Sequence, residues 1–319
     1  MKRYLRAGAF ALALLFVASS CQRENKTTIA VIPKGRAHQF WQTVHAGAAK
    51  AAAELNVDIV WNGPASETDY TGQIQIVENM ITRRVDAIAL APIDKTAMVG
   101  VVQRAARENI PVVIFDSGID TDEFVSQVAT DNYAAGKLAA QRMAQILNGK
   151  GRVAMVAVQP GAASTMAREE GFEDAVREKF PDIKIVDKRY GMADFAKSLA
   201  VAENILTAHP GLDGIFASNE SSSVGTVQAL KQRRVQVKLV GFDWSPALIE
   251  DLKAGVADSL VVQQPFRMGE ESVRAAVAKL RNQPVTKMNN LEPRLILRED
   301  LDKPEIQALL NPDLKRYLK

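Results

Sequence analysis

Two pairs of aspartates, each spaced thirty residues apart, are the feature of this sequence that points most directly to a binding chemistry. Asp86 and Asp116 form the first pair, and Asp213 and Asp243 form the second. Asp116 and Asp243 each follow a short apolar run, and an ionised carboxylate accepts hydrogen bonds with both of its oxygens. Such side chains suit a ligand rich in hydroxyl groups. The alternative is that each aspartate only caps the helix or turn that follows it.

The apolar runs before these aspartates are typical of buried strands in a parallel sheet. Residues 112–115 and 239–240 are short and apolar, and a segment of helical length separates each from an earlier run, at 85–90 or 215–217. Side chains that follow parallel strands lie at the carboxyl edge of the sheet, where open α/β sheets bind ligands. Asn219 follows one of these strands, and we expect it at the same edge.

The repetition of this arrangement predicts an α/β fold of two similar, doubly wound parallel-sheet lobes that face each other across a ligand-binding cleft. A chain of 319 residues that is 47% hydrophobic is long enough for two such lobes. The expected boundaries are 27–130 with 264–293 for the N-terminal lobe, and 131–263 with 294–300 for the C-terminal lobe. The chain would then cross between the lobes three times, near Thr130, near Gln264 and at 291–294, forming a three-segment hinge. The polar segment 301–319 is expected to be a surface tail.

The first twenty residues are typical of an export signal. Three basic residues precede an apolar run over 7–18, which is too short to span a membrane as a finished helix. Cys21, the only cysteine, then stands where bacterial lipoproteins are cleaved and acylated, with 21–26 as a tether. Ala18 replaces the leucine usual three residues before that cysteine. Plain secretion with a free thiol is therefore the alternative to a lipid anchor.

The composition argues against several other classes of protein. Without the three basic residues of the signal, thirty-seven Lys and Arg balance thirty-seven Asp and Glu, and no helix-turn-helix segment precedes the first strand, so nucleic acid is not an expected partner. His38, His45 and His209 do not have the spacing of a zinc site. The sequence contains no nucleophile elbow, P-loop or dinucleotide fingerprint. We therefore expect no enzyme, no cofactor and no metal.

Aromatic side chains near the expected loop tips complete the candidate site. Phe40, Trp41, Phe195 and Trp244 lie beside the polar residues in the predicted arrangement. A sugar presents hydroxyl groups in its ring plane, which suit Asp, Asn, Gln and Arg, and apolar faces, which suit flat aromatic rings. The alternative for each aromatic is packing in the core.

Six short segments make the chain resemble periplasmic sugar-binding proteins of the ribose-binding type, the ligand-capturing components of ABC importers. The segments are ATDN at 129–132, REEGF at 168–172, ADF at 193–195, LTAHP at 206–210, FASN at 216–219 and VGFD at 240–243. The resemblance runs from about residue 27 to 298. It implies a type I periplasmic binding protein fold and a monomer that captures a monosaccharide in the periplasm and delivers it to a permease of the inner membrane.

The resemblance also implies roles for individual residues. Those implied to hydrogen-bond the sugar are Asp116, Arg168, Asn219, Asp243 and Gln263, and those implied to stack on it are Phe40, Trp41 and Phe195. Thr130 belongs to one of the matching segments, and His38 stands where the ribose binders carry an amide; both are added to the site. Arg168 has a helix salt bridge as its alternative role, and Gln263 a hydrogen bond in the hinge.

Three departures from the ribose-binding pattern bear on which sugar is bound. Ribose binders carry Asn-Asn-Pro-Phe-Phe where this chain has 37–41, Ala-His-Gln-Phe-Trp. Ala91 stands in place of an asparagine, and Ser117 in place of an arginine. With these changes, another pentose, a hexose or a sugar derivative fits the site as well as ribose does.

The sequence does not separate two outputs for such a binding protein, of which the first is the leading hypothesis. The first is delivery of the sugar to a permease. The second is a sensor whose closed form docks on a chemoreceptor or on the outer domain of a signalling kinase. A transcription regulator with the same two-lobed core is disfavoured by the export signal. In either favoured case the only expected membrane contact is a lipid on Cys21.

Overall fold

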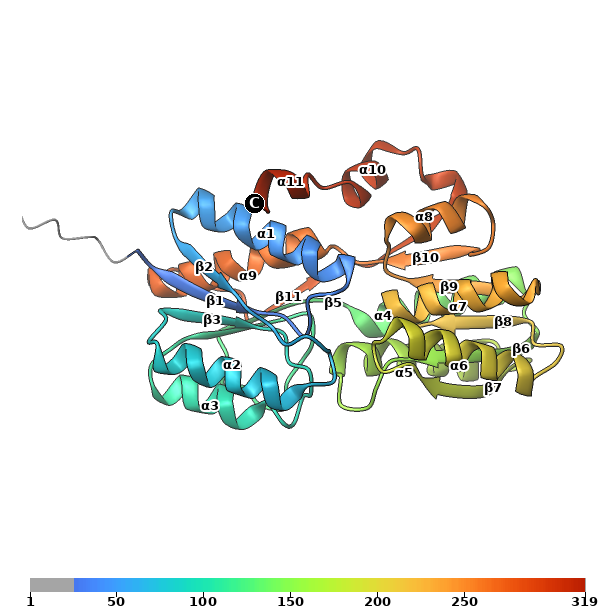
Figure 1. The fold of residues 1–319 in the computed structure, drawn as a ribbon, viewed down its shortest axis with the longest axis horizontal. Helices are drawn as coiled ribbons and strands as arrows, with labels where there is room; N and C mark the ends of the chain where they lie inside the picture. Colours follow the sequence, from blue (N-terminus) through green and yellow to red (C-terminus); the bar gives the residue numbers. More distant parts are fainter. Residues whose placement is uncertain (1–25, 319) are drawn as a thin grey trace, which may run out of the picture.

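The computed structural model describes residues 26–318, which form two α/β lobes arranged along the long axis of the molecule (Figure 1). The expected export signal, the lipidation site Cys21 and most of the tether lie outside these residues. Within 26–318, no helix has the length and apolar character needed to cross a membrane.

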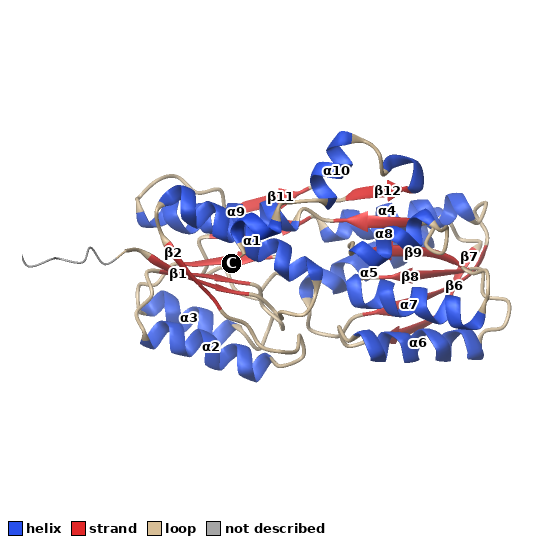
Figure 2. Cartoon of the chain, turned by 45° about the horizontal axis from the view of Figure 1, so that its top comes forward, coloured by secondary structure: helices blue, strands red, loops and turns tan. Residues whose placement is uncertain are grey.

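The N-terminal lobe is a six-stranded sheet with helices on both faces. Its strands, in spatial order, are β11 (Met288–Leu291), β5 (Ser126–Thr130), β4 (Val112–Phe115), β3 (Ala87–Leu90), β1 (Thr28–Ile32) and β2 (Asp58–Trp61). Helices α1 (Gln39–Leu55) and α9 (Pro265–Leu280) cover one face, and α2 (Tyr70–Thr82) and α3 (Val99–Arg107) cover the other (Figure 2). Because β1 is buried on both sides, Ile29 and Val31 join one core while Ala30 and Ile32 join the other.

The C-terminal lobe repeats this plan. Its strands, in spatial order, are β12 (Arg294–Leu297), β10 (Ser259–Val262), β9 (Lys238–Phe242), β8 (Gly214–Ala217), β6 (Gly151–Ala157) and β7 (Ile183–Tyr190). Its helices are α4 (Asn132–Ile146), α5 (Ala163–Lys179), α6 (Phe195–Ala208), α7 (Glu220–Arg233) and α8 (Pro246–Lys253). Helices α4 and α5 pack on one core, and α6, α7 and α8 on the other.

The chain passes between the two sheets at three places, after β5, after β10 and between β11 and β12. The last crossing changes the expected topology, because β12 pairs with β10 in the antiparallel sense while the other strand pairs of residues 26–318 are parallel. Only Glu292 and Pro293 separate β11 from β12, so the chain continues into the second lobe without reversing. It therefore runs opposite to β10, which leads out of that lobe. The C-terminal sheet is thus mixed at its edge, not fully parallel.

Residues 301–318 form more structure than a polar surface tail. Leu301, Ile306 and Leu310 are buried in the core of the C-terminal lobe, the last two on α10 (Pro304–Leu310). Helix α11 (Leu314–Tyr317) then contacts α1 of the N-terminal lobe, and Tyr317 packs against Phe266 with ring centroids 5.9 Å apart. The C-terminal segment therefore touches both lobes, as its position in Figure 1 shows.

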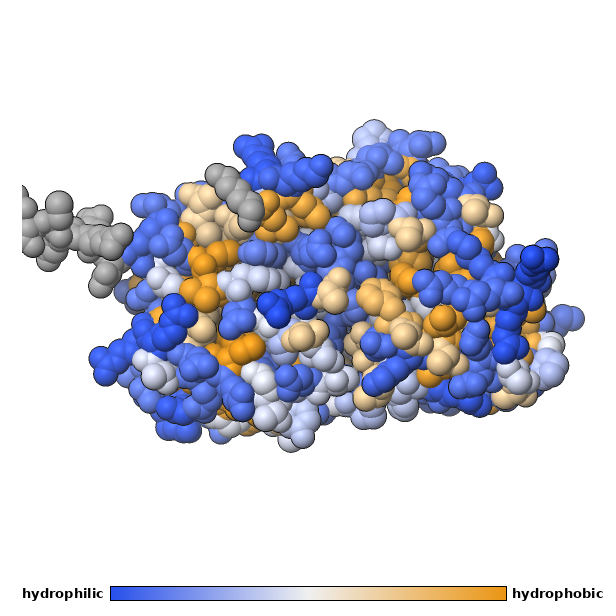
Figure 3. All heavy atoms as spheres, in the orientation of Figure 1, coloured by the Kyte–Doolittle hydropathy of each residue, from blue (hydrophilic) through white to orange (hydrophobic). Residues whose placement is uncertain are grey.

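The face seen in Figure 3 is mostly hydrophilic, with hydrophobic side chains in small groups. The large hydrophobic side chains that are exposed within 26–318 lie on separate elements. They are Tyr70, Met166, Tyr190, Val235 and Met288. Single exposed hydrophobic side chains of this kind are common on folded domains and need no special explanation.

Candidate functional site

The two members of each aspartate pair lie at opposite ends of the strands and make different contacts. Asp86 and Asp213 precede β3 and β8, and each carboxylate accepts a backbone N–H at the start of the neighbouring strand, from Thr28 or Arg152 respectively, at 2.7 Å. Asp86 and Asp213 therefore hold the amino ends of strands.

Asp116 and Asp243 follow β4 and β9 at the carboxyl edges of the two sheets. Both have left-handed backbones, with φ of 61° and 66°, which non-glycine residues rarely adopt. Each backbone N–H bonds to the next strand, Asp116 to Val128 at 3.0 Å and Asp243 to Val261 at 2.8 Å. Both side chains are buried. A sparsely populated conformation repeated at two equivalent buried positions is typical of a functional site.

The N-terminal lobe supplies a cation for its aspartate. Lys34 follows β1, and its Nζ lies 2.7 Å from Oδ2 of Asp116, with both side chains almost fully buried. The same Nζ donates to Oγ of Ser164 in the other lobe at 2.9 Å. Burying the two charges together avoids an isolated ion in the cleft.

The C-terminal lobe supplies Arg168 and Asp243. Arg168 donates to Oδ1 of Asn132 at 2.7 Å and to the carbonyl of Ser218 at 3.0 Å, and it lies over the ring of Phe242 at 3.9 Å. No ion pair involves Arg168 within residues 26–318, so the helix salt bridge is not its role. Asp243 accepts from Nε2 of Gln263 at 2.7 Å. Burial raises the pKa of Asp243, and the positive charge of Arg168 opposes that shift.

The start of α1 carries a second ion pair. His38 Nδ1 lies 2.7 Å from Oε1 of Glu67, which also accepts from the indole N–H of Trp41 at 2.7 Å. Burial alone would lower the pKa of His38, but the carboxylates of Glu67, Glu220 and Asp243 raise it to about 9. Burial likewise favours neutral Glu67, yet His38 and Lys34 outweigh it and lower the pKa of Glu67. His38 is therefore an imidazolium at neutral pH.

These side chains line a small cavity between the lobes, with a volume of about 30 Å³. Its lining residues are Lys34, His38, Phe40, Trp41, Glu67, Asp116, Ser164, Thr165, Arg168, Asn219, Asp243 and Gln263. Ligand pockets range upward from about 300 Å³, so the lining side chains must move apart before the cavity can hold a small molecule. The structure thus brings together eight of the ten residues predicted to form the site.

The other two predicted residues stand beside the cavity. Phe195 packs against His38 in a T-shaped arrangement with ring centroids 5.0 Å apart. Thr130 donates to Oε1 of Gln263 at 2.7 Å, where the chain leaves the N-terminal lobe. Trp244 packs in the C-terminal core, as its structural alternative predicted. Asn219 both caps α7, by accepting from Ser222 N at 2.9 Å, and lines the cavity.

The sequence analysis missed Lys34, Glu67, Ser164 and Thr165. Lys34 and Glu67 lie in the loops that follow β1 and β2, so the rule that identified Asp116 and Asp243 applies to them too. Ser164 and Thr165 open α5 with ordinary side chains, and no signal in their spacing distinguishes them.

Direct hydrogen bonds hold the two lobes together around the cavity. Ser164 N donates to Oγ of Ser117 at 3.1 Å, and Nε2 of Gln159 donates to the carbonyl of Glu67 at 2.8 Å. At the rim, Lys95 N donates to the carbonyl of Gly161 at 2.9 Å. The structure is therefore a closed form of the two lobes.

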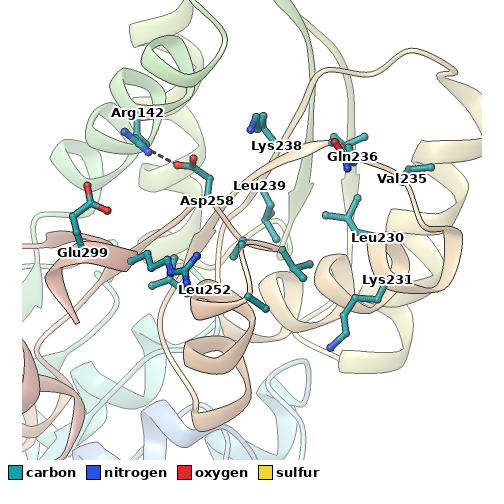
Figure 4. Close-up of a pocket in the computed structure, with 16 residues that line it drawn as sticks. Arg142, Leu230, Lys231, Val235, Gln236, Lys238, Leu239, Leu252, Asp258 and Glu299 are labelled. Carbon is teal, nitrogen blue, oxygen red and sulfur yellow. Dashed lines mark hydrogen bonds and ion pairs between the residues drawn. The ribbon is translucent and has the colours of Figure 1, made fainter. Parts of the chain in front are cut away.

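A larger hollow of about 570 Å³ lies on the outer side of the C-terminal lobe, away from the interlobe contacts (Figure 4). Its lining includes Lys231, Gln236, Lys238 and the ion pair of Arg142 with Asp258 at 2.7 Å. The labelled side chains spread around an open rim and do not converge. The interlobe cavity is therefore the stronger candidate. In the described part of the chain, no cluster of three or more His, Cys, Asp or Glu could hold a metal ion.

Comparison with known proteins agrees with this geometry. A D-ribose/D-allose-binding protein of Pseudomonas aeruginosa is 32% identical over 287 residues, covering 83% of this chain and 89% of that protein. A carbohydrate transporter solute binding protein of Agrobacterium radiobacter, solved with D-arabinose, superposes with a TM-score of 0.88 at 33% identity, over 90% of this chain and 100% of that one.

A second solved structure, an ABC transporter solute binding protein of Agrobacterium vitis with bound D-fucose, gives a TM-score of 0.87 at 35% identity, over 89% of this chain and 100% of that chain. The family described as periplasmic binding protein domain matches residues 29–284, which include most of both lobes and every residue lining the cavity. This chain belongs to the periplasmic binding protein domain family.

Proposed function

We propose that this protein is the sugar-binding component of an ABC importer, which captures one monosaccharide between its lobes and delivers it to a permease. The observation that carries the proposal is the lining of the interlobe cavity, where carboxylates from strand ends of both lobes meet amides and aromatic rings. Asp116 and Asp243 offer acceptors for ring hydroxyls, and Phe40 and Trp41 offer apolar surface for a ring face.

The charges in the cavity favour an uncharged sugar. The lining contains three basic side chains and three acidic side chains, so its charges are balanced. The basic ones are Lys34, His38 and Arg168, and the acidic ones are Glu67, Asp116 and Asp243. A ligand with a net charge would add a buried charge that no lining residue compensates, which is costly. The relatives named above were described with ribose or allose, D-arabinose and D-fucose. We propose a pentose or hexose of this uncharged kind.

We further propose that closure of the lobes is how the loaded state is signalled. The proposed units are 27–130 with 264–293 and 131–263 with 294–300, connected by three short crossings. Such crossings allow a hinge motion, for which periplasmic binding proteins are a standard example. A sugar held by both lobes stabilises the closed form because its contacts are incomplete when the lobes are apart.

The proposed location is the periplasmic side of the inner membrane, with a lipid on Cys21 as the only membrane contact and a monomeric chain. The Cys21→Ala variant should be released from membranes in a bacterium that processes lipoproteins. Fractionation of the wild-type protein as soluble would contradict the anchor. We propose binding without chemical conversion, which recovery of an unchanged sugar from the complex would test.

A thermal-shift screen against a panel of monosaccharides tests the proposed function. The panel includes D-ribose, D-allose, D-arabinose and D-fucose, with a glycerol control for nonspecific stabilisation. A ligand at about one hundred times its dissociation constant stabilises the protein by roughly 2.7 kcal/mol. No shift with any pentose or hexose would overturn the proposal.

A further inference from the structure

Helix α1 lacks an N-terminal cap from its own lobe. Its N-cap residue is His38, whose side chain makes no capping hydrogen bond and pairs with Glu67 instead. The first N–H groups of an α-helix have no partner within the helix and need an external acceptor. In this structure Glu220 supplies it: Oε1 accepts from Gln39 N at 3.1 Å and Oε2 from Phe40 N at 3.0 Å.

Glu220 belongs to the opposite lobe, where it is the first residue of α7. One carboxylate thus closes the end of a helix 180 residues away in the sequence. The charge suits the place, because a helix N-terminus carries partial positive charge and the imidazolium of His38 lies beside it. Burial raises the pKa of Glu220 to about 7, while His38 and the two backbone bonds oppose that rise.

Glu220 does not line the cavity, yet its backbone is tied to a residue that does. Its N–H donates to Oδ2 of Asp243 at 3.1 Å. The same residue therefore connects one strand-end carboxylate of the site to the helix that carries Phe40 and Trp41. This connection exists only while the lobes are closed, since α1 and α7 belong to different lobes.

We propose that Glu220 is a positioning residue for closure, whose carboxylate completes the cap of α1 across the cleft and thereby slows the release of bound sugar. The inference rests on the proposed function, since it requires a protein that closes on a ligand. Opening the hinge returns the two N–H groups and the carboxylate to water. Their contact then stabilises only the closed form and shifts the population toward it.

The test compares Glu220→Ala and Glu220→Gln with the wild type. The probe is the panel sugar that gives the largest thermal shift, and Trp41 in the cavity wall provides a fluorescence signal for stopped-flow mixing. The dissociation rate should rise at least about fivefold in Glu220→Ala, as expected for the loss of a helix cap, and by less in Glu220→Gln. The association rate and the melting temperature of the sugar-free protein should stay unchanged.

Asp69→Ala is the matched control. Asp69 caps α2 within the N-terminal lobe, accepting from Gly72 N at 2.8 Å, and does not line the cavity. Its loss should lower the melting temperature of the sugar-free protein and leave the dissociation rate unchanged. The same pattern in Glu220→Ala would show an ordinary structural cap and overturn the inference.

Gln39→Pro probes the contact from the other side. Proline is well tolerated at the first helical position, and the extended backbone of His38, with φ of −78° and ψ of 149°, accepts a following proline. The substitution removes one N–H that Glu220 binds. It should speed dissociation in the wild-type background and have no further effect in Glu220→Ala.

Additive effects of the two substitutions would overturn the inference, because they would show that the N–H and the carboxylate act separately. Equal dissociation rates in wild type and Glu220→Ala would overturn it as well. A wild-type chain that binds none of the monosaccharides would instead overturn the proposed function. The two failures are therefore distinguishable.

Discussion

At the scale of single residues, the site depends on two carboxylates that are buried and whose backbones adopt an unfavourable conformation. Asp116 and Asp243 are buried and adopt left-handed backbones. Oδ2 of Asp243 accepts from Glu220 N at the start of α7 at 3.1 Å, and Oδ1 accepts from Gln263 at 2.7 Å. Asn219 and Ser245 cap the helices that follow β8 and β9. A carboxylate has about four acceptor positions, so both aspartates can accept further hydrogen bonds from a ligand in addition to these contacts.

Replacing Asp243 separates this role from a structural one. Asp243→Ala should lower sugar affinity at least tenfold, because each lost charge-assisted hydrogen bond costs about 1.5–3 kcal/mol. Asp213→Ala is the control: its carboxylate supports Arg152 N at the far end of the sheet, so this variant should lose stability and keep its affinity. Calorimetric titration measures both, and unchanged affinity in Asp243→Ala would remove this residue from the site.

The ion pair of His38 predicts a pH dependence. Because the folded pKa is raised from 6.5 to about 9, the stabilisation is fully present below pH 6.5 and is lost as the pH rises through 9. A shift of one pKa unit corresponds to about 1.36 kcal/mol, so the ion pair contributes at most about 3 kcal/mol to the free energy of unfolding. Melting temperatures of the sugar-bound protein should fall between pH 6.5 and 9. His38→Gln should flatten that slope, and an equal slope in both proteins would contradict the assignment.

Site residues that follow a strand could be predicted from the sequence, whereas those that a helix brings into the site were harder to predict. Asp116 and Asp243 follow strands whose apolar runs are evident in the sequence. Ser164 enters the site only because the lobes close and bring α5 against Lys34. That contact depends on the angle between the lobes, which the local sequence pattern does not contain.

At the scale of elements, the helix pair α4 and α5 sets the position of Arg168. The two helices approach so closely that a Cβ on Gly136 would lie 1.9 Å from the carbonyl oxygen of Arg168. Gly171 makes the reciprocal approach to Tyr133. Both glycines are interior to helices, where glycine is unfavourable, so close packing explains their presence.

Gly136→Ala should force the helices apart, move Arg168 and weaken both folding and sugar binding. Overpacking of a close contact typically costs about 1–3 kcal/mol. Gly100→Ala in α3 is the matched control, because a Cβ there meets nothing within 4 Å. Helix propensity predicts a gain of about 0.5–1 kcal/mol for that control. Denaturant unfolding and calorimetry measure both variants, and a neutral Gly136→Ala would show that the helices can separate freely.

Most helices and strands of this chain could be predicted because hydrophobic periodicity and caps agree. Asp194 caps α6 at Lys197, and Pro265 occupies the start of α9, both evident in the sequence. The direction of β12 was not predictable in this way. Its apolar run fits either direction, and its pairing follows from the short connection to β11.

At the scale of the whole molecule, the chain crosses between the lobes three times and then spans them again with its C-terminal segment. The repeated strand–helix pattern allowed the crossings to be placed from sequence. The position of the C-terminal segment was not predictable from the sequence. Leu301, Ile306 and Leu310 are separated by polar residues, and they become a hydrophobic cluster only when packed on the folded C-terminal lobe. Helix α11 then rests on α1. We expect these connections to limit the lobes to a hinge-like opening motion.

This arrangement predicts that the bound sugar changes the size of the molecule. A ligand that contacts Asp116 on one lobe and Asn219 and Asp243 on the other favours the closed form, whereas one that bound both forms equally would shift nothing. The radius of gyration in small-angle scattering should therefore fall when the sugar is added. Combining Asn219→Ala with Asp243→Ala should abolish this compaction while the far-ultraviolet circular dichroism of the folded chain persists. Identical scattering curves with and without a saturating sugar would mean that the lobes do not move, and a permease would then need a signal other than closure to recognise the loaded protein.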